Sequence, residues 1–147
     1  MRTVTVRTRA AQLFCASVLA AQAYAVVHAY HDPLKRFGFQ PFAESTTWRA
    51  RIEAVDGSGR RQDIADGFQG YRWDELVRER VVDPFHTHDA KQGIDASLYF
   101  LQRALDYVAD HTPNDRGTRY LEATVWYRKN RRPEAQVTLR SHTRALP

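Results

Sequence analysis

Hydrophobic residues change their spacing several times along the chain, and each spacing predicts a different element. Residues 10–30 form an apolar run without Asp, Glu, Lys or Arg. A helix of about 20 apolar residues is long enough to cross the hydrocarbon core of a bilayer. The run therefore predicts one N-terminal membrane-spanning helix. Its many alanines and two glutamines make it only moderately hydrophobic.

Alternating segments predict one β-hairpin early and one late in the remaining chain. Residues 48–55 alternate apolar and charged side chains, which is the period of a half-buried strand. The Asp-Gly-Ser-Gly sequence at 56–59 predicts a turn, because these residues tolerate positive φ, and a short strand follows at 60–65. Residues 118–129 alternate in the same way and, after a turn, 135–140 predicts the final strand.

Helical spacing lies between the two hairpins. One helix is predicted to begin near Trp73 and to end before Pro84. A second, at about residues 90–110, places Ile, Leu and Val on one stripe, with Asp89 as its N-cap and Gln92 completing a capping box. The fold class is therefore α+β: one N-terminal transmembrane helix, then a small β-β-α-α-β-β domain with a largely antiparallel four-stranded sheet.

These elements divide the chain into four parts. We expect a membrane anchor at 1–31, a linker at 32–46, an α+β domain at 47–142 and a tail at 143–147. The anchor is short, so the rest of the chain is long enough to build one core of its own.

The charges beside the apolar run favour one orientation. Arg2, Arg7 and Arg9 precede the run, with no acidic residue among them. Basic flanks stay in the cytoplasm, so we expect a single-pass protein of the cell membrane with its N-terminus inside and its domain outside. The alternative is a secretory signal peptide cleaved after Ala23 or Ala25, which would also send the domain across the membrane.

The chain is basic, with a formal net charge of +5. Acidic residues are interleaved with the basic ones through most of the sequence, so we expect no nucleic-acid partner. The compact basic cluster is Arg128, Lys129, Arg131 and Arg132. It is interpreted as a solvated hairpin tip, with contact to anionic lipid or an acidic partner as the alternative. The single cysteine, Cys15, lies in the apolar run and excludes an intrachain disulfide.

One part of the sequence has the residue types of a metal site. His86 and His88 form a His-x-His pair beside Asp89. Zinc would need a further ligand, for which His111 is the nearest candidate, and Asp89 is also the predicted N-cap. No nucleophile elbow, phosphate-binding glycine loop or zinc-protease motif occurs. We therefore expect no catalytic residue and no cofactor.

Two surfaces are candidates for binding a partner. Tyr120, Glu122 and Trp126 share one face of the strand at 118–129, and this face is unusually aromatic for one exposed to solvent. Glu122 could bind a ligand or form a salt bridge to an arginine. In the apolar run, Ala16 and Ala20 are small enough to allow close packing against another membrane helix.

A family resemblance rests on three stretches of sequence. They are FGFQPFAESTTWRARIEAVDGSGRR from position 37, YRWDEL from position 71 and TRYLEATVWYRKN from position 118. Together they resemble the extramembrane segment of the vitamin K-dependent gamma-carboxylase-like family, and the chain also looks like small actinobacterial membrane proteins. The resemblance implies a hairpin, then helices, then an aromatic strand. In that family the catalytic groups belong to a multi-pass membrane region that this chain lacks, so no catalytic residue is carried over.

These observations lead to one main hypothesis and two alternatives. The main hypothesis is a non-catalytic single-pass accessory protein whose outer domain binds a multi-pass membrane protein, such as a carboxylase-like one. The first alternative is a secreted or tethered module for a small ligand of unknown identity. The second is a metal-dependent enzyme at His86 and His88.

Overall fold

The computed structural model describes residues 2–32, 44–65, 73, 77, 84–112 and 117–144. The chain forms two compact units, residues 1–41 and residues 42–147. The predicted helix that begins near Trp73 lies outside the described residues, apart from Trp73 and Val77, which are both helical.

The N-terminal unit contains helix α1 (Arg2–His31). Its segment Thr8–His31 is long and apolar enough to cross a membrane, and none of that segment's most apolar stretch is buried. Large apolar side chains such as Leu13, Phe14 and Leu19 are each about two-thirds exposed or more. The apolar helix predicted from the sequence is therefore present.

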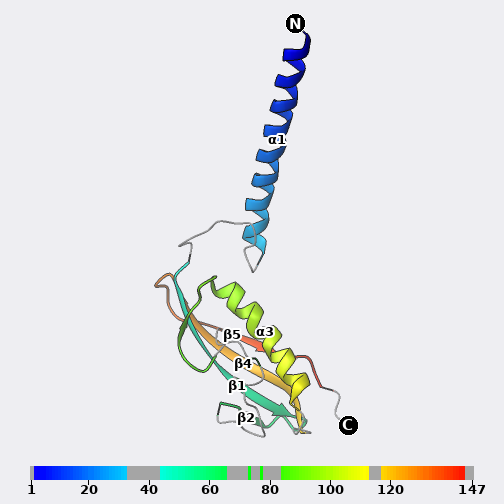
Figure 1. Cartoon of the computed structure of the whole chain (residues 1–147). Coiled ribbons are helices and arrows are strands. Elements are labelled where there is room, and N and C mark those ends of the chain that lie inside the picture. Colours follow the sequence, from blue (N-terminus) through cyan, green and yellow to red (C-terminus); the bar gives the residue numbers. More distant parts are fainter. Residues whose placement is uncertain are drawn as a thin grey trace. The chain divides into compact units, whose positions relative to one another are not determined.

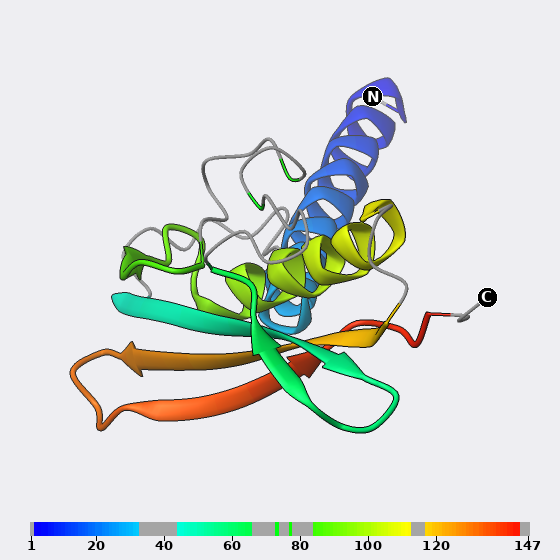
Figure 2. The ribbon, with the colours of Figure 1, turned by 90° about the horizontal axis from the view of Figure 1, so that it is seen from below.

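The second unit is built on an antiparallel sheet (Figures 1 and 2). Its strands are β1 (Thr46–Asp56), β2 (Arg61–Asp63), β3 (His88–Asp89), β4 (Thr118–Lys129) and β5 (Ala135–Arg140). The order across the sheet is β2-β1-β4-β5, and β3 pairs with the beginning of β1. The α+β class and the antiparallel sheet are thus confirmed, with β3 as an additional short strand.

Helix α3 (Ile94–His111) lies across one face of this sheet (Figure 2). Its buried stripe includes Leu101, Leu105 and Val108, all without exposed surface. They belong to the same core as apolar side chains of the two central strands, such as Ile52 and Leu121. Each large aliphatic side chain contributes about 1.5–3 kcal/mol when it is fully buried. This packing is the main stabilisation of the domain.

The alternation of the strands decides which residues remain outside. In β1 the inward positions are buried, whereas Arg49 and Arg51 between them are exposed. Successive side chains of a strand point to opposite faces, so the second face of the sheet carries the charged set. We call this second face the open sheet face.

The predicted N-terminus of the second helix is wrong. Asp89 does not cap a helix; it lies in β3, opposite Thr47, and the backbone N–H of Ala90 donates to Thr46 O at 2.7 Å. Helix α3 begins only at Ile94, after Gly93, which has φ 88° and makes no capping bond because it has no side chain. Pairing with β1 holds the residues before the helix in the sheet, so the helix starts later than the local pattern indicates.

The cap comes instead from Glu44, 50 residues earlier in the chain. Its Oε1 accepts hydrogen bonds from the backbone N–H of Ile94 and from Thr46 Oγ1, both at 2.7 Å. Its other oxygen lies 2.7 Å from Lys129 Nζ, and only 4% of the side chain is exposed. Burial raises the pKa of Glu44, but the hydrogen bonds from Lys129, Thr46 and Ile94 outweigh it and hold the pKa below its ordinary value. Glu44 lies in the segment expected to be linker, and it joins a helix, β1 and β4.

The turn between β4 and β5 has an unusual backbone. Asn130 and Arg131 both have positive φ, 49° and 61°, and Arg132 N donates to Lys129 O at 2.9 Å. This is the pattern of a type I′ turn, for which Asn-Gly is the favoured sequence. Asn130 is also bonded to Ser45 through its backbone N–H (2.7 Å) and its side-chain oxygen (2.8 Å).

We expect Arg131→Gly to stabilise the domain. Glycine adopts positive φ without the steric cost that arginine has, so the free energy of unfolding should rise by about 0.5–1 kcal/mol. Denaturant unfolding of the purified chain measures this change. A lower stability would show that the Arg131 side chain makes a stabilising contact.

Glu44→Gln should destabilise the domain, because an amide cannot replace the ion pair to Lys129. The expected loss is about 1–3 kcal/mol near neutral pH. The matched control is Glu134→Gln, since Glu134 is an exposed carboxylate 3.8 Å from Arg49 and should change stability by less than about 0.5 kcal/mol. The wild-type advantage should disappear as the pH falls through the lowered pKa of Glu44. Equal losses of stability in the two variants would show that Glu44 does not stabilise the domain more than an exposed carboxylate does.

Candidate functional site

The three strand residues expected to bind a partner all lie on the open sheet face. Trp126 is opposite Arg49 of β1 and Gln136 of β5, and Glu122 is opposite Glu53 and Arg140. Of the described helices in this unit, α3 covers the other face (Figure 2). The central strand therefore presents these side chains between two rows of polar neighbours.

Glu122 is held by arginines from both neighbouring sides. Its Oε2 lies 2.8 Å from Arg140 Nη2, and its Oε1 accepts a hydrogen bond from Arg61. Arg61 also pairs with Glu53 at 3.2 Å, so it separates two carboxylates that would otherwise repel each other across the strands. Burial raises the pKa of Glu122, but the two arginines lower it by more than burial raises it. The pKa of Glu122 therefore lies below its ordinary value. Both oxygens are thus occupied in salt bridges, which favours that interpretation over ligand binding.

The two aromatic residues of the open sheet face are each covered by an arginine. The guanidinium carbon of Arg49 lies 4.9 Å from the ring centroid of Trp126, and that of Arg140 lies 4.3 Å from the ring of Tyr120. Such cation–π contacts are worth about 0.5–1 kcal/mol at exposed sites. The rings are therefore held in place, and the face alternates flat guanidinium groups with aromatic rings. Both groups are enriched at protein interfaces.

The predicted histidine pair does not gather further ligands in the described part of the chain. His86 is exposed, whereas His88 is partly buried with its ring 6.1 Å from that of Trp48. Within the described residues, no group of three or more His, Cys, Asp and Glu side chains could hold a metal ion. The structure thus places His88 as a packing neighbour of β1.

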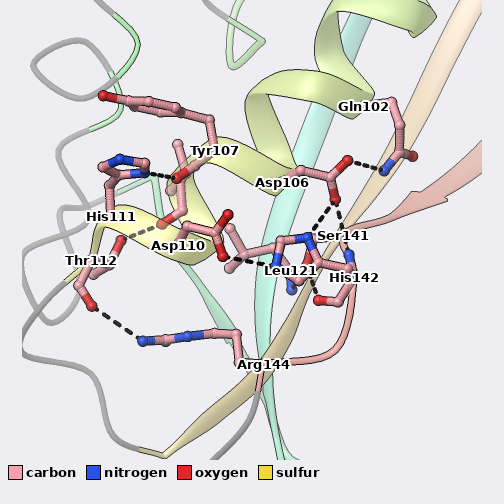
Figure 3. A network of polar contacts seen from close by, with 11 residues as sticks. Gln102, Asp106, Tyr107, Asp110, His111, Thr112, Leu121, Ser141, His142 and Arg144 are labelled. Carbon is pink, nitrogen blue, oxygen red and sulfur yellow. Dashed lines mark hydrogen bonds and ion pairs between the residues drawn. The ribbon is translucent and has the colours of Figure 1, made fainter.

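A second polar cluster was missed by the sequence analysis (Figure 3). His142, just after β5, lies between two carboxylates of α3: its Nε2 is 2.8 Å from Asp110 Oδ1 and its Nδ1 is 3.2 Å from Asp106 Oδ1. Its backbone N–H also donates to Asp106 at 2.9 Å. The two aspartates are four residues apart and so share a helix face, but nothing local identifies their partner 32 residues further on.

The contacts of this cluster attach the segment after β5 to α3, and they leave no ring nitrogen of His142 available for proton transfer. The hydrogen bond to Asp110 is the largest cause of a raised pKa for His142, and Asp106 adds to it. Because each ring nitrogen already faces a carboxylate, neither is free to act as a general base. Next to it, Ser141 exchanges two 2.9 Å hydrogen bonds with Leu121.

The residues after His142 are bound as well. Arg144 donates its backbone N–H to Arg119 O at 2.7 Å and its guanidinium to Thr112 O at 3.2 Å (Figure 3). The segment expected to be a tail therefore begins inside the domain. It closes the end of the sheet against the C-terminus of α3.

In the N-terminal unit, Ala16 and Ala20 lie one turn apart on α1 and are both exposed. Residues four apart lie on the same helix face, so together they form a smooth strip.

Comparison with known proteins identifies no relative: no family model, no curated protein and no solved structure matches the chain.

We expect His142→Gln to remove a pH dependence of stability. Because the folded pKa of His142 is raised, its contribution is fully present below the ordinary value of 6.5 and is lost as the pH rises through the folded pKa. The stability difference between wild type and variant should therefore be larger at about pH 6 than at about pH 8.5. Urea unfolding at the two pH values measures it.

The control for this experiment is His111→Gln, which changes an exposed histidine of α3 that faces Tyr107 O at 2.8 Å and stacks on the Tyr107 ring, with no carboxylate contact among the described residues. It should leave the pH dependence of the wild type intact. The role of the two aspartates would be refuted by a His142→Gln variant that follows the wild-type pH profile.

Proposed function

We propose that this chain is a non-catalytic single-pass membrane accessory protein whose outer domain binds a multi-pass membrane protein. The observation that carries the proposal is α1, whose 24-residue segment Thr8–His31 is apolar enough to cross a membrane and whose most apolar stretch is not buried. Each of its large apolar side chains would gain about 1.5–3 kcal/mol on leaving water. A lipid bilayer supplies that environment for a helix that is apolar on all sides.

The orientation follows from the charges at the ends of the helix. Arg2, Arg7 and Arg9 lie before the apolar run at 10–30, whereas Asp32, Lys35 and Arg36 follow it. This asymmetry supports a cytoplasmic N-terminus and an outer domain.

The domain supports binding more than catalysis. Two of its charged clusters are occupied internally: Glu122 is held by two arginines and His142 by two aspartates. The open sheet face, in contrast, presents Trp126 and Tyr120 with arginines stacked on them. Rigid aromatic and arginine side chains are the usual anchors of protein interfaces.

Two features support a membrane-embedded partner. Ala16 and Ala20 give α1 a strip at which another helix could approach closely. The resemblance to the extramembrane segment of the vitamin K-dependent gamma-carboxylase-like family supports a multi-pass partner.

The test is co-purification of the tagged full-length chain from native membranes in mild detergent, with mass spectrometry of the recovered proteins. We expect a stoichiometric multi-pass protein with the wild type. Trp126→Ala and Tyr120→Ala should lower its recovery at least about tenfold, as for anchor residues of an interface.

The matched control is Tyr107→Ala, which removes a tyrosine that is 47% exposed on α3, away from the open sheet face. It should leave recovery unchanged, and thermal unfolding should show that all three variants are folded. Recovery of the wild-type chain alone would contradict the proposal and favour the small-ligand module.

A further inference from the structure

The tip of the β4–β5 hairpin carries basic groups that the rest of the domain does not neutralise. Arg128, Arg131 and Arg132 are all exposed, and within the described residues none of their guanidinium groups has an ion pair, a hydrogen bond or a ring contact. Lys129, between them, is already paired with Glu44. Three positive charges thus remain uncompensated within a five-residue stretch.

Of the other arginines in the described part of the domain, all but Arg119 have a partner for the side chain. Those with a carboxylate, a ring or an oxygen as partner are Arg49, Arg51, Arg60, Arg61, Arg103, Arg140 and Arg144. Within the described residues, the guanidinium groups without a partner are therefore those of the tip and that of Arg119 at the other end of the sheet, so most of them lie together at the tip. Such a concentration attracts an anionic surface.

The backbone holds this tip in place with respect to the point where the chain enters the domain. Asn130 makes two hydrogen bonds with Ser45, and Lys129 pairs with Glu44. From Glu44 the chain runs back to Asp32, at the end of α1, through 11 residues that span at most about 40 Å. The tip is thus fixed to the end of the domain at which the chain enters it.

The backbone conformation of Arg131 in the turn also indicates a function for this residue. Arg131 has φ 61°, a conformation that glycine adopts freely and arginine does not. Strained residues persist where the surrounding structure holds them and are concentrated at functional sites. An arginine at the most projecting position of the hairpin is consistent with a function of its charge.

We propose that Arg128, Arg131 and Arg132 bind anionic lipid headgroups of the membrane in which α1 is anchored. The inference rests on the proposed membrane anchoring but not on the multi-pass partner. Phosphate groups are suitable ligands for guanidinium, which donates planar pairs of hydrogen bonds. Docking the tip would hold the domain at the bilayer surface and limit the positions of the open sheet face.

The test uses the full-length chain reconstituted in vesicles of phosphatidylcholine alone or of phosphatidylcholine mixed equally with phosphatidylglycerol. A fluorescent donor on Gln136→Cys in a Cys15→Ser background reports energy transfer to an acceptor lipid. We expect more transfer in the anionic vesicles and a loss of the difference in high salt. A donor on Ser58→Cys, in the turn at the other end of the sheet, should respond less.

The variant pair is Arg131→Gln with Arg132→Gln, and its matched control is Arg60→Gln with Arg119→Gln. Both remove two exposed positive charges, but the control pair lies at the end of the sheet away from the tip. Each arginine near an anionic surface contributes about fivefold to the docking equilibrium, so the tip pair should lower it about 25-fold and the control pair only slightly.

The outcomes separate this inference from the proposed function. If the chain resists carbonate extraction but transfer is the same in both lipids, or falls equally in both variant pairs, lipid docking is wrong and the anchoring stands. The tip variant could instead fail to recover an acidic protein that the wild type recovers from native membranes, with no dependence on lipid. That result would assign the tip to a protein partner and overturn the lipid-docking proposal. Extraction of the wild-type chain by carbonate would overturn the anchoring itself.

Discussion

The carboxylate of Glu44 is the point at which separate parts of the domain meet. It accepts the first free backbone N–H of α3, bonds Thr46 at the beginning of β1 and pairs with Lys129 at the end of β4. A buried carboxylate is costly unless it is paired, and here every partner comes from a different element. The position of the helix on the sheet, the entry of the chain and the hairpin tip are therefore coupled through one side chain.

The two faces of the sheet differ in their interactions: one packs apolar side chains and the other pairs charged ones. The inner face packs apolar side chains of β1 and β4 under α3 and supplies the stability. The open sheet face must keep two opposed carboxylates, Glu53 and Glu122, next to each other, and it does so with arginines from both flanking strands. One of them, Arg140, also covers the ring of Tyr120, and Arg49 of β1 covers that of Trp126. One network thus neutralises charge and holds the anchor residues of the proposed interface rigid, which reduces the entropy lost on binding.

The proposed membrane functions of the two units reinforce each other. A helix that spans the bilayer restricts the domain to a thin layer beside the membrane, and a short connection raises the effective concentration of the hairpin tip at the surface. Contacts of the three arginines with lipid would then orient the domain. An oriented open sheet face would meet a membrane partner from one direction only.

Local patterns in the sequence determined the strands and the apolar helix. The bounds 118–129 and 135–140 predicted for the last two strands are those of β4 and β5, because alternation with a period of two depends only on neighbouring residues. The apolar run without charges was likewise sufficient for α1. The aromatic face of β4 followed from the same alternation, so its three candidate residues were found together.

Only the tertiary structure decided which polar groups meet. Asp89 has the local pattern of an N-cap, yet pairing with β1 placed it in a strand, and Glu44 took over the cap. His142 joins aspartates 32 and 36 residues away, and no spacing along the chain reveals such a pair. Hydrogen bonds of this kind depend on distances in space that the packing of α3 on the sheet creates, so they follow from the fold and not from any local pattern.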